Sequence, residues 1–352
     1  MYYYNFPAVK GVQANSEYYI CMIPCGLLSK IFIFESEDIL PEYRAQRKLN
    51  QLRIPEMKNY ILNNRDTYVF SALAASIDGI FEFNEIDNSN LGTLNIDMNA
   101  KFLINDGQHR KKAIEEAIRE DETLINETIP VVFFKDKGLA RSQQMFTDLN
   151  KHAVNTSKSL NTLYDSSNEI AVMTKQVVEK IEFFKLYTDK ENDTLGKFSQ
   201  KLFTLNNFYN ANQKMLMGID LNEEVKKFIF NYWDLLSKSI YEWNQLDTKE
   251  ITKRSLREDY IITQGVVLLA FGKLGNYFIK NKKYSFDKYL PKLMKINWAR
   301  NCDKWKNRTI VNGKISRKEE NINLTYIQIK RELNLPITDK ELDSEKKIIK
   351  DR

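Results

Sequence analysis

Histidine and cysteine are scarce in this chain, which has two histidines and three cysteines among 352 residues. The cysteines, Cys21, Cys25 and Cys302, are odd in number and form no complete disulfide framework. Together with His109 and His152 they make a poor set of zinc ligands. We therefore expect reduced thiols and no metal.

Glycine and proline are also rare, with twelve and seven residues, or about 5% of the chain against a usual value of roughly 12%. A long flexible linker is therefore not expected. No apolar stretch follows a basic start as in a signal peptide, and no apolar run approaches the ~18 residues that span a bilayer. We expect a soluble, cytoplasmic protein with no membrane partner.

The remaining composition suffices for two packed domains, because 43% of the 352 residues are hydrophobic. Residues 1–165 mix β-rich runs with amphipathic helical patterns, and residues 166–352 are mainly helical in period. The expected fold class is α+β followed by all-α, with Trp233, Trp243 and Trp298 among the packing anchors. The expected strands are 2–6, 18–23, 68–73, 80–83 and 129–134, and the expected helices are 41–50, 55–63, 139–152, 170–186, 223–238, 259–280, 284–296 and 324–333, with another from 338.

The stretch 105–110, Asn-Asp-Gly-Gln-His-Arg, follows an alternating apolar run and precedes an amphipathic helix. This pattern predicts a strand, a tight turn and a helix. We expect Asp106 to cap the helix and Gly107 to let the backbone approach closely. The first helical turn then carries Gln108, His109 and Arg110, followed by two lysines.

A cationic first turn has the wrong sign for a helix start, because the helix dipole already places positive charge there. The turn makes better sense if it binds an anion. Arg110 falls on the same helical stripe as Ala113, Ile114 and Ala117, so we expect it to face a cleft. The alternative is a solvated basic turn without a ligand.

Other groups suited to an anion occur in two further stretches. Arginine offers a planar fork for phosphate oxygens, so several arginines and a helix start could hold a nucleotide or a DNA phosphate. The polar end of the expected helix 139–152 would complete the cleft, and a catalytic role for either histidine is weighed against a purely structural one. The additional candidates are Arg44, Gln46, Arg47, Arg53, Asn150 and His152.

Positive charge is concentrated near the C-terminal part of the chain. Between Lys273 and Lys318 there are 14 Lys or Arg and two acids, which gives +12 for a segment of a chain whose net charge is +6. A phosphate backbone is the commonest partner of such a concentration, although a lysine-rich composition could contribute without function. The expected DNA-binding residues are Lys304, Lys306, Arg308, Lys314, Arg317 and Lys318. The helix, turn and helix after this loop are compatible with a helix-turn-helix element.

Several stretches carry a resemblance to a known family. Residues 106–110 are the motif for which DGQHR-domain proteins are named. The stretches 44–47 and 53–54 precede this motif and the stretches 146–150 and 298–335 follow it, in an order that resembles the DndB family of DNA sulfur modification proteins. The resemblance implies an N-terminal fold similar to ParB-type partition proteins and sulfiredoxin, with the turn 107–110 binding a nucleotide phosphate. It implies an acidic–Asn metal pair that Asp148 and Asn150 match only loosely, so no metal is assigned.

Two functions remain. The resemblance implies a DNA-binding negative regulator of a DNA phosphorothioate modification operon, with promoter DNA as partner, other DNA sulfur modification proteins as further partners and oligomerisation possible. The alternative is a nucleotide-hydrolysing or DNA-nicking accessory enzyme of the same modification and defence system, with Asp106 and Asp148 as metal ligands. No Walker loop, dinucleotide fingerprint, zincin helix or nucleophile elbow occurs, which favours the regulator. A nucleotide is the only cofactor considered.

Overall fold

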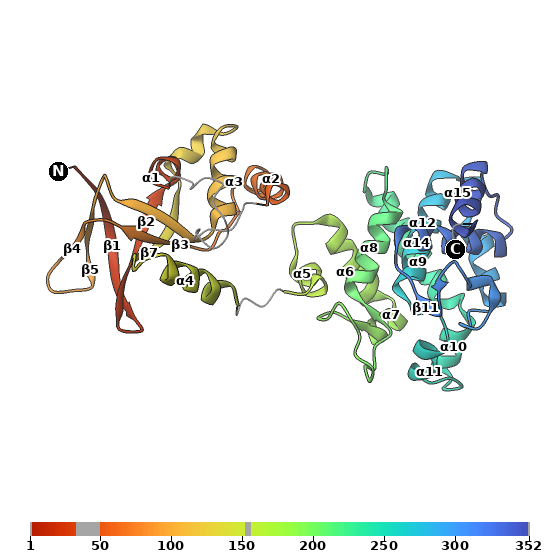
Figure 1. Cartoon of the computed structure of the whole chain (residues 1–352). Coiled ribbons are helices and arrows are strands. Elements are labelled where there is room, and N and C mark those ends of the chain that lie inside the picture. Colours follow the sequence, from red (N-terminus) through yellow and green to blue (C-terminus); the bar gives the residue numbers. More distant parts are fainter. Residues whose placement is uncertain (1, 33–49, 152–155, 351–352) are drawn as a thin grey trace. The chain divides into compact units, whose positions relative to one another are not determined.

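The computed structural model describes residues 2–32, 50–151 and 156–350. The chain divides into two compact units, 1–154 and 155–352 (Figure 1). The boundary expected after residue 165 lies beyond α5 (Lys158–Tyr164), which packs against α8 (Leu205–Met215) within the second unit.

The first unit is built on a seven-stranded sheet in the order β4-β5-β1-β2-β7-β3-β6. All neighbouring strands are antiparallel except β3 and β7. The unit is therefore a mixed α and β structure in which only β1 with β2 and β4 with β5 pair as consecutive strands. The strands are β1 (Tyr3–Gln13), β2 (Ser16–Pro24), β3 (Leu73–Asp78), β4 (Phe81–Glu85), β5 (Leu91–Asp97), β6 (Lys101–Asp106) and β7 (Thr128–Lys135).

Helices cover both faces of the sheet around β3, where all residues except the last are buried. On one face Leu73 belongs to the same apolar core as Ala113 and Ala117 of α3 (Gln108–Ile118). In Figure 1, α1 (Leu28–Ile31), α2 (Ile54–Asn63) and α3 lie on this side and α4 (Leu139–Lys151) on the other. Helix α2 packs against α3, the helix that begins at the motif.

Several expected elements of this unit need correction. The strand expected from 68 begins only at Leu73, because Tyr68 and Val69 are held instead by side-chain hydrogen bonds, from the Tyr68 hydroxyl to Glu127 and from the Val69 N–H to the Tyr60 hydroxyl. Strand β5 was not predicted. The helix expected over 41–50 falls almost entirely outside the described residues.

The second unit is mainly helical, with two small two-stranded sheets. Its core surrounds α12, which is apolar on nearly every face. The longer helices are α6 (Glu169–Lys180), α8, α9 (Glu223–Lys238), α12 (Gly265–Lys280), α14 (Glu319–Glu332) and α15 (Asp339–Lys350). The shorter ones are α5, α7 (Glu182–Tyr187), α10 (Tyr241–Asp247), α11 (Lys253–Glu258) and α13 (Phe286–Tyr289).

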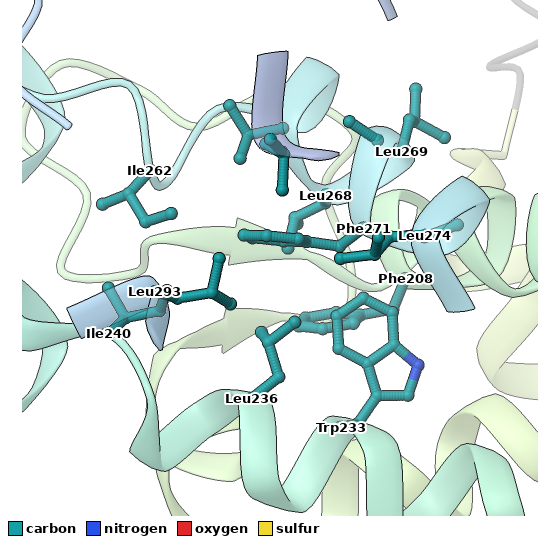
Figure 2. Packing of buried hydrophobic residues seen from close by; sticks show 14 of the residues in the cluster. Phe208, Trp233, Leu236, Ile240, Ile262, Leu268, Leu269, Phe271, Leu274 and Leu293 are labelled. Atoms are coloured by element: carbon teal, nitrogen blue, oxygen red, sulfur yellow. The ribbon is translucent and has the colours of Figure 1, made fainter. Parts of the chain in front are cut away.

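The expected tryptophan anchors are fully buried in this core, including Trp233 and Trp243. Figure 2 shows Trp233 and Leu236 of α9 beside Phe208 of α8, and the Trp233 and Phe208 rings lie 5.3 Å apart. The indole N–H of Trp233 donates to Asn212 Oδ1 at 2.8 Å, so its polar atom is satisfied. The helical unit therefore has a buried aromatic interior.

The helical periods placed α9 correctly, but other boundaries differ. The pattern over 170–186 is two helices, because Ile181 adopts an extended backbone while its side chain stays buried in the core. The pattern over 259–280 becomes a helix only at Gly265, and the pattern over 284–296 is α13 followed by a 3-10 helix, Leu290–Lys295. Buried apolar side chains thus recur at the helical period even where the backbone is not a continuous helix.

Candidate phosphate and DNA sites

The turn between β6 and α3 requires glycine. Gly107 is the N-cap residue of α3 and has φ +98°, in the left-handed region. A Cβ at this position would overlap Leu73 Cδ2 and lie 2.9 Å from Arg110 Nη2. Asp106 does not cap the helix as expected, since no side chain caps α3 and Asp106 instead accepts a hydrogen bond from Arg110.

Arg110 folds back over Gly107. Its guanidinium donates to Asp106 Oδ2 and to Ser71 Oγ, and its side chain is 16% exposed. The Nε atom is buried and has no hydrogen-bond partner within the described part of the chain. The arginine is therefore fixed beside the turn with one donor still available.

The other cations of this first turn are neutralised by their own helix. Lys111 Nζ lies 2.6 Å from Glu115, and Lys112 Nζ lies 3.1 Å from Glu116. Gln108 is buried, and its amide donates to the Ile104 carbonyl at 3.3 Å. The charge pattern that suggested an anion is thus partly explained by i,i+4 ion pairs.

His109 joins the motif to the segment before α2. Its Nε2 accepts a hydrogen bond of 2.8 Å from the Asn50 N–H, so this ring nitrogen is unprotonated in this arrangement. Asn50 directly follows residues 33–49, which contain Arg44, Gln46 and Arg47 and lie outside the described residues. Sequence reasoning missed Asn50, because a backbone donor leaves no signature in side-chain type.

The remaining candidates of this site are distributed unevenly. Arg53 is exposed at the end of a short 3-10 helix, Gln51–Arg53, that leads into α2. His152 lies outside the described residues, and so does the side chain of Asn150 on α4. The structure therefore places Arg53, His109 and Arg110 on elements that pack together, and leaves the partners expected on α4 undefined.

Asn105 is a further polar residue of the motif strand, and it is completely buried. Its amide nitrogen donates to Ser76 Oγ at 2.7 Å and approaches Met145 Sδ of α4 at 3.2 Å. These contacts connect the strand that precedes the turn to α4. A polar residue directly after three apolar ones in this strand was the signal for it in the sequence.

The cations expected to bind DNA surround a hairpin that we call the basic hairpin, residues 304–318. Strands β10 (Ile310–Val311) and β11 (Lys314–Ile315) meet at a turn in which Asn312 and Gly313 have positive φ. The buried Trp305 ring stacks on Trp298 at 5.0 Å and anchors the base of the hairpin. The hairpin is therefore held against the helical core.

All six cations except Arg308 are exposed, but three of the six are engaged with other residues. Lys306, Lys314 and Lys318 are exposed. Each of the engaged cations contacts one partner closely. These contacts join Lys304 Nζ to Glu332 at 2.8 Å, Arg308 Nη2 to Glu345 at 2.8 Å and Arg317 Nη2 to Asn207 Oδ1 at 2.7 Å.

The pKa values reflect these contacts. The hydrogen bond to Glu332 raises the pKa of Lys304, so its charge is stabilised but locally compensated. Burial lowers the pKa of Arg317, whose guanidinium packs against Gly265 although the residue as a whole is exposed. The cations available to a phosphate backbone are therefore fewer than the sequence suggested.

Helices α14 and α15 form the pair that suggested a helix-turn-helix element. Most residues of α14 from Asn321 to Lys330 are buried, so this helix belongs to the core. Helix α15 is fastened to it by ion pairs of 2.8 Å between Lys330 and Glu341 and 2.6 Å between Arg331 and Glu345. Of the pair, α15 has the more exposed surface.

No helix of residues 2–32, 50–151 and 156–350 is both long and apolar enough to cross a membrane. Within the same ranges, no three His, Cys, Asp or Glu side chains gather as metal ligands would. Asp148 is exposed and accepts a hydrogen bond of 2.6 Å from Gln144 of its own helix.

The motif thus forms a strand, a left-handed glycine and an arginine-bearing helix in an α+β unit, and a helical unit follows in the chain. A family model described as DndB, DNA-sulfur modification-associated, matches residues 6–336. The chain therefore belongs to the DndB family and takes part in DNA sulfur modification. No curated protein and no solved structure matches it.

Proposed function

We propose that the chain is a cytoplasmic, DNA-binding negative regulator of transcription of a DNA phosphorothioate modification operon. Its partners are the promoter DNA of that operon and other DNA sulfur modification proteins. The observation that carries the proposal is that three lysines of the basic hairpin, Lys306, Lys314 and Lys318, are exposed. No ion pair of these three is formed with any described carboxylate, so their charge is free for phosphate oxygens.

The scaffold under these lysines supports such a surface. Trp298 and Trp305 stack beneath the hairpin, and Glu345 holds Arg308 and Arg331 together. Because the backbone under these lysines is already held by the core, binding has to order only their side chains, at about 0.5–1.5 kcal/mol each. DNA binding mainly through phosphates is the expected mode, with sequence selectivity supplied by other contacts.

For the first unit, we infer a fold similar to ParB-type proteins and sulfiredoxin, with a phosphate-binding turn at 107–110. The left-handed Gly107, the folded-back Arg110 with its unpartnered Nε, and a first helical turn without a side-chain cap support this inference. Backbone N–H groups at an uncapped helix start favour an anion. A nucleotide at this turn would act as an effector of the regulator.

The same turn supports the alternative, a nucleotide-hydrolysing or DNA-nicking accessory enzyme. His109 is the residue on which such chemistry would depend, but its Nε2 is already an acceptor for the Asn50 N–H. Asp106 is paired with Arg110, and Asp148 with Gln144. Groups already engaged are poorly placed to bind a metal or to accept a proton, so we favour the regulator.

A deletion of the gene tests the proposal directly. Transcripts of the neighbouring DNA modification operon should rise several-fold, because repression is lost, while sulfur in the DNA persists. Both quantities are measured in one culture, by quantitative reverse transcription and by mass spectrometry of digested DNA. Unchanged transcripts with lost DNA sulfur would overturn the assignment, and nucleotide-dependent nicking that vanishes in His109→Ala would establish the enzyme.

A further inference from the structure

The helical unit contains a basic pocket distinct from the basic hairpin. Its volume is ≈ 430 Å³, and none of the six cations expected to bind DNA lines it. Helices α8, α12, α14 and α15 contribute its walls. The residues used below are Lys214, Lys273, Lys280, Glu319, Asn323, Lys340 and Glu341.

The acidic residues of the pocket are already paired. Glu319 lies 2.8 Å from Lys214 Nζ, and Glu341 lies 2.8 Å from Lys330 Nζ. Glu341 also accepts the Thr338 N–H at 2.8 Å. Both carboxylates are therefore paired, and they do not neutralise the other lysines of the pocket.

Lys273 is the cation most in need of a partner. Its ammonium donates to Asn323 Oδ1, a neutral acceptor, and lies 5.6 Å from the centre of the Tyr326 ring. Burial lowers the pKa of Lys273 below its ordinary value, even though Glu319 acts to raise it. A half-buried ammonium without a close carboxylate is stabilised by an incoming anion.

Two further lysines point charge toward the same space. Lys280 donates to the Met217 carbonyl at 2.7 Å, which leaves its charge uncompensated, and Lys340 of α15 is exposed. With Lys273 they make three cations without a carboxylate partner among the described residues. The spacing of Lys273, Asn276 and Lys280 puts one polar stripe on the otherwise apolar α12, which was a signal in the sequence.

The aromatic rings of the pocket do not offer a stacking surface. Tyr277 has Lys330 Nζ 4.5 Å from its ring centre and stacks on Tyr284 at 5.7 Å. Tyr326 is buried, with Lys273 and Lys330 both near its ring. Recognition here would therefore depend on charge and on ammonium donors more than on a planar base.

We propose that this pocket binds the phosphate group of a small molecule, either an inorganic polyphosphate or the phosphate chain of a nucleotide. Three ammonium groups with unspent charge suit a compact, multiply charged anion, and the volume admits a ligand of either size. Such a ligand would bridge α12 to α15. It would thereby stabilise the helical unit, because it binds the folded pocket only.

The test measures pyrophosphate and ATP binding to the full chain by isothermal titration and by melting temperature. All proteins carry Arg110→Ala, so that the turn of the first unit cannot contribute. Pyrophosphate and ATP should both raise the melting temperature, which places recognition on the phosphates; a response to ATP alone identifies a nucleotide as the source. Lys273→Met should weaken binding roughly tenfold or more, as loss of one charge-assisted hydrogen bond implies.

Two matched variants control this experiment. Lys340→Met removes an exposed charge of the pocket and should weaken binding with no effect on folding, whereas Lys288→Met removes an exposed lysine of α13 outside the pocket and should change nothing. No response to millimolar pyrophosphate or ATP overturns the proposal. Equal responses of Lys273→Met and Lys288→Met also overturn it, as does a loss of DNA binding in Lys273→Met without any small-anion binding, which would assign the pocket to DNA.

Discussion

Arg308 and Glu345 form an ion pair of 2.8 Å, although they lie 37 residues apart in the sequence. Glu345 also accepts Arg331 at 2.6 Å, so one carboxylate joins the basic hairpin, α14 and α15. Only 9% of the Glu345 side chain is exposed, which strengthens both contacts. Arg308 therefore stabilises the fold through Glu345, and its charge is not free for DNA.

The first prediction separates free from engaged cations in DNA binding. The triple variant Lys306→Ala, Lys314→Ala and Lys318→Ala should lower the salt slope of DNA binding by about three, since each phosphate contact contributes about 0.9. Affinity should fall for all sequences alike, because phosphate contacts do not read bases. Fluorescence anisotropy with promoter and unrelated duplexes, at about 50 to 200 mM salt, measures the salt slope and the affinity for each sequence.

Lys304→Ala is the matched control for this experiment. Its ammonium is paired with Glu332 at 2.8 Å, so removing it should change the salt slope less than removal of Lys306, Lys314 or Lys318 alone does. If the triple variant binds DNA as well as the wild type while remaining folded, the basic hairpin is not the DNA surface.

The second prediction concerns the stability of the helical unit. Glu345→Gln removes the charge that two guanidinium groups share, and should lower the free energy of unfolding by about 2 kcal/mol, as for hydrogen bonds to charged groups. Urea denaturation at neutral pH measures the loss. Glu258→Gln is a suitable control, because its ion pair with Arg254 is largely exposed and such pairs contribute little.

The same carboxylate makes a prediction for acid pH. Burial acts to raise the pKa of Glu345, but hydrogen bonds from Arg331 and Arg308 outweigh it and leave the pKa below the ordinary value of 4.5. A lowered folded-state pKa contributes stability above pH 4.5 that is lost as the pH falls through the lowered value. The difference in stability between wild type and Glu345→Gln should therefore shrink on acidification, and a constant difference would contradict the ion-pair account.

The sequence predicted the coarse fold because the apolar periodicity of helices and strands can be read from one sequence alone. Helix α9 begins and ends where its period does, and the tryptophans are buried. The order of the sheet could not be predicted, since the pairing of β1 with β5 and of β3 with β7 depends on contacts between distant segments. Extended stretches such as 68–72 look like strands by composition, yet side-chain hydrogen bonds hold them as loops.

The structure gives partners for the candidate site residues that the sequence could not indicate. The need for glycine at 107 follows from a motif with a turn, and the geometry gives its reason. The sequence could not indicate that Lys304 and Arg308 are matched by Glu332 and Glu345, because these acids follow the basic segment and approach it only through tertiary packing. Net charge along a chain thus overestimates the free charge on a surface.

The fourth prediction tests the turn of the first unit. Gly107→Ala places a Cβ against Leu73 and at a φ of +98°, so it should cost about 2 kcal/mol or more of stability. Gly313→Ala shares only the backbone strain, since nothing lies within 4 Å of its Cβ position at φ +74°, and should cost about 1 kcal/mol. Denaturant titration compares the two, and equal losses would mean that the contact with Leu73 relaxes freely.

The last prediction is that Arg110 belongs to an anion site and is more than a partner of Asp106. Its buried Nε has no acceptor among the described residues, and the start of α3 lacks a side-chain cap, so a phosphate at this turn would satisfy both. In a Lys273→Met background, which weakens the pocket of the helical unit, ATP should raise the melting temperature, and Arg110→Ala should remove most of that rise while the circular dichroism spectrum is unchanged. Arg110→Lys keeps the charge but loses the fork, and should restore only part of the response. Equal shifts with and without Arg110 would show that the arginine serves only to hold Asp106 and Ser71 around the turn.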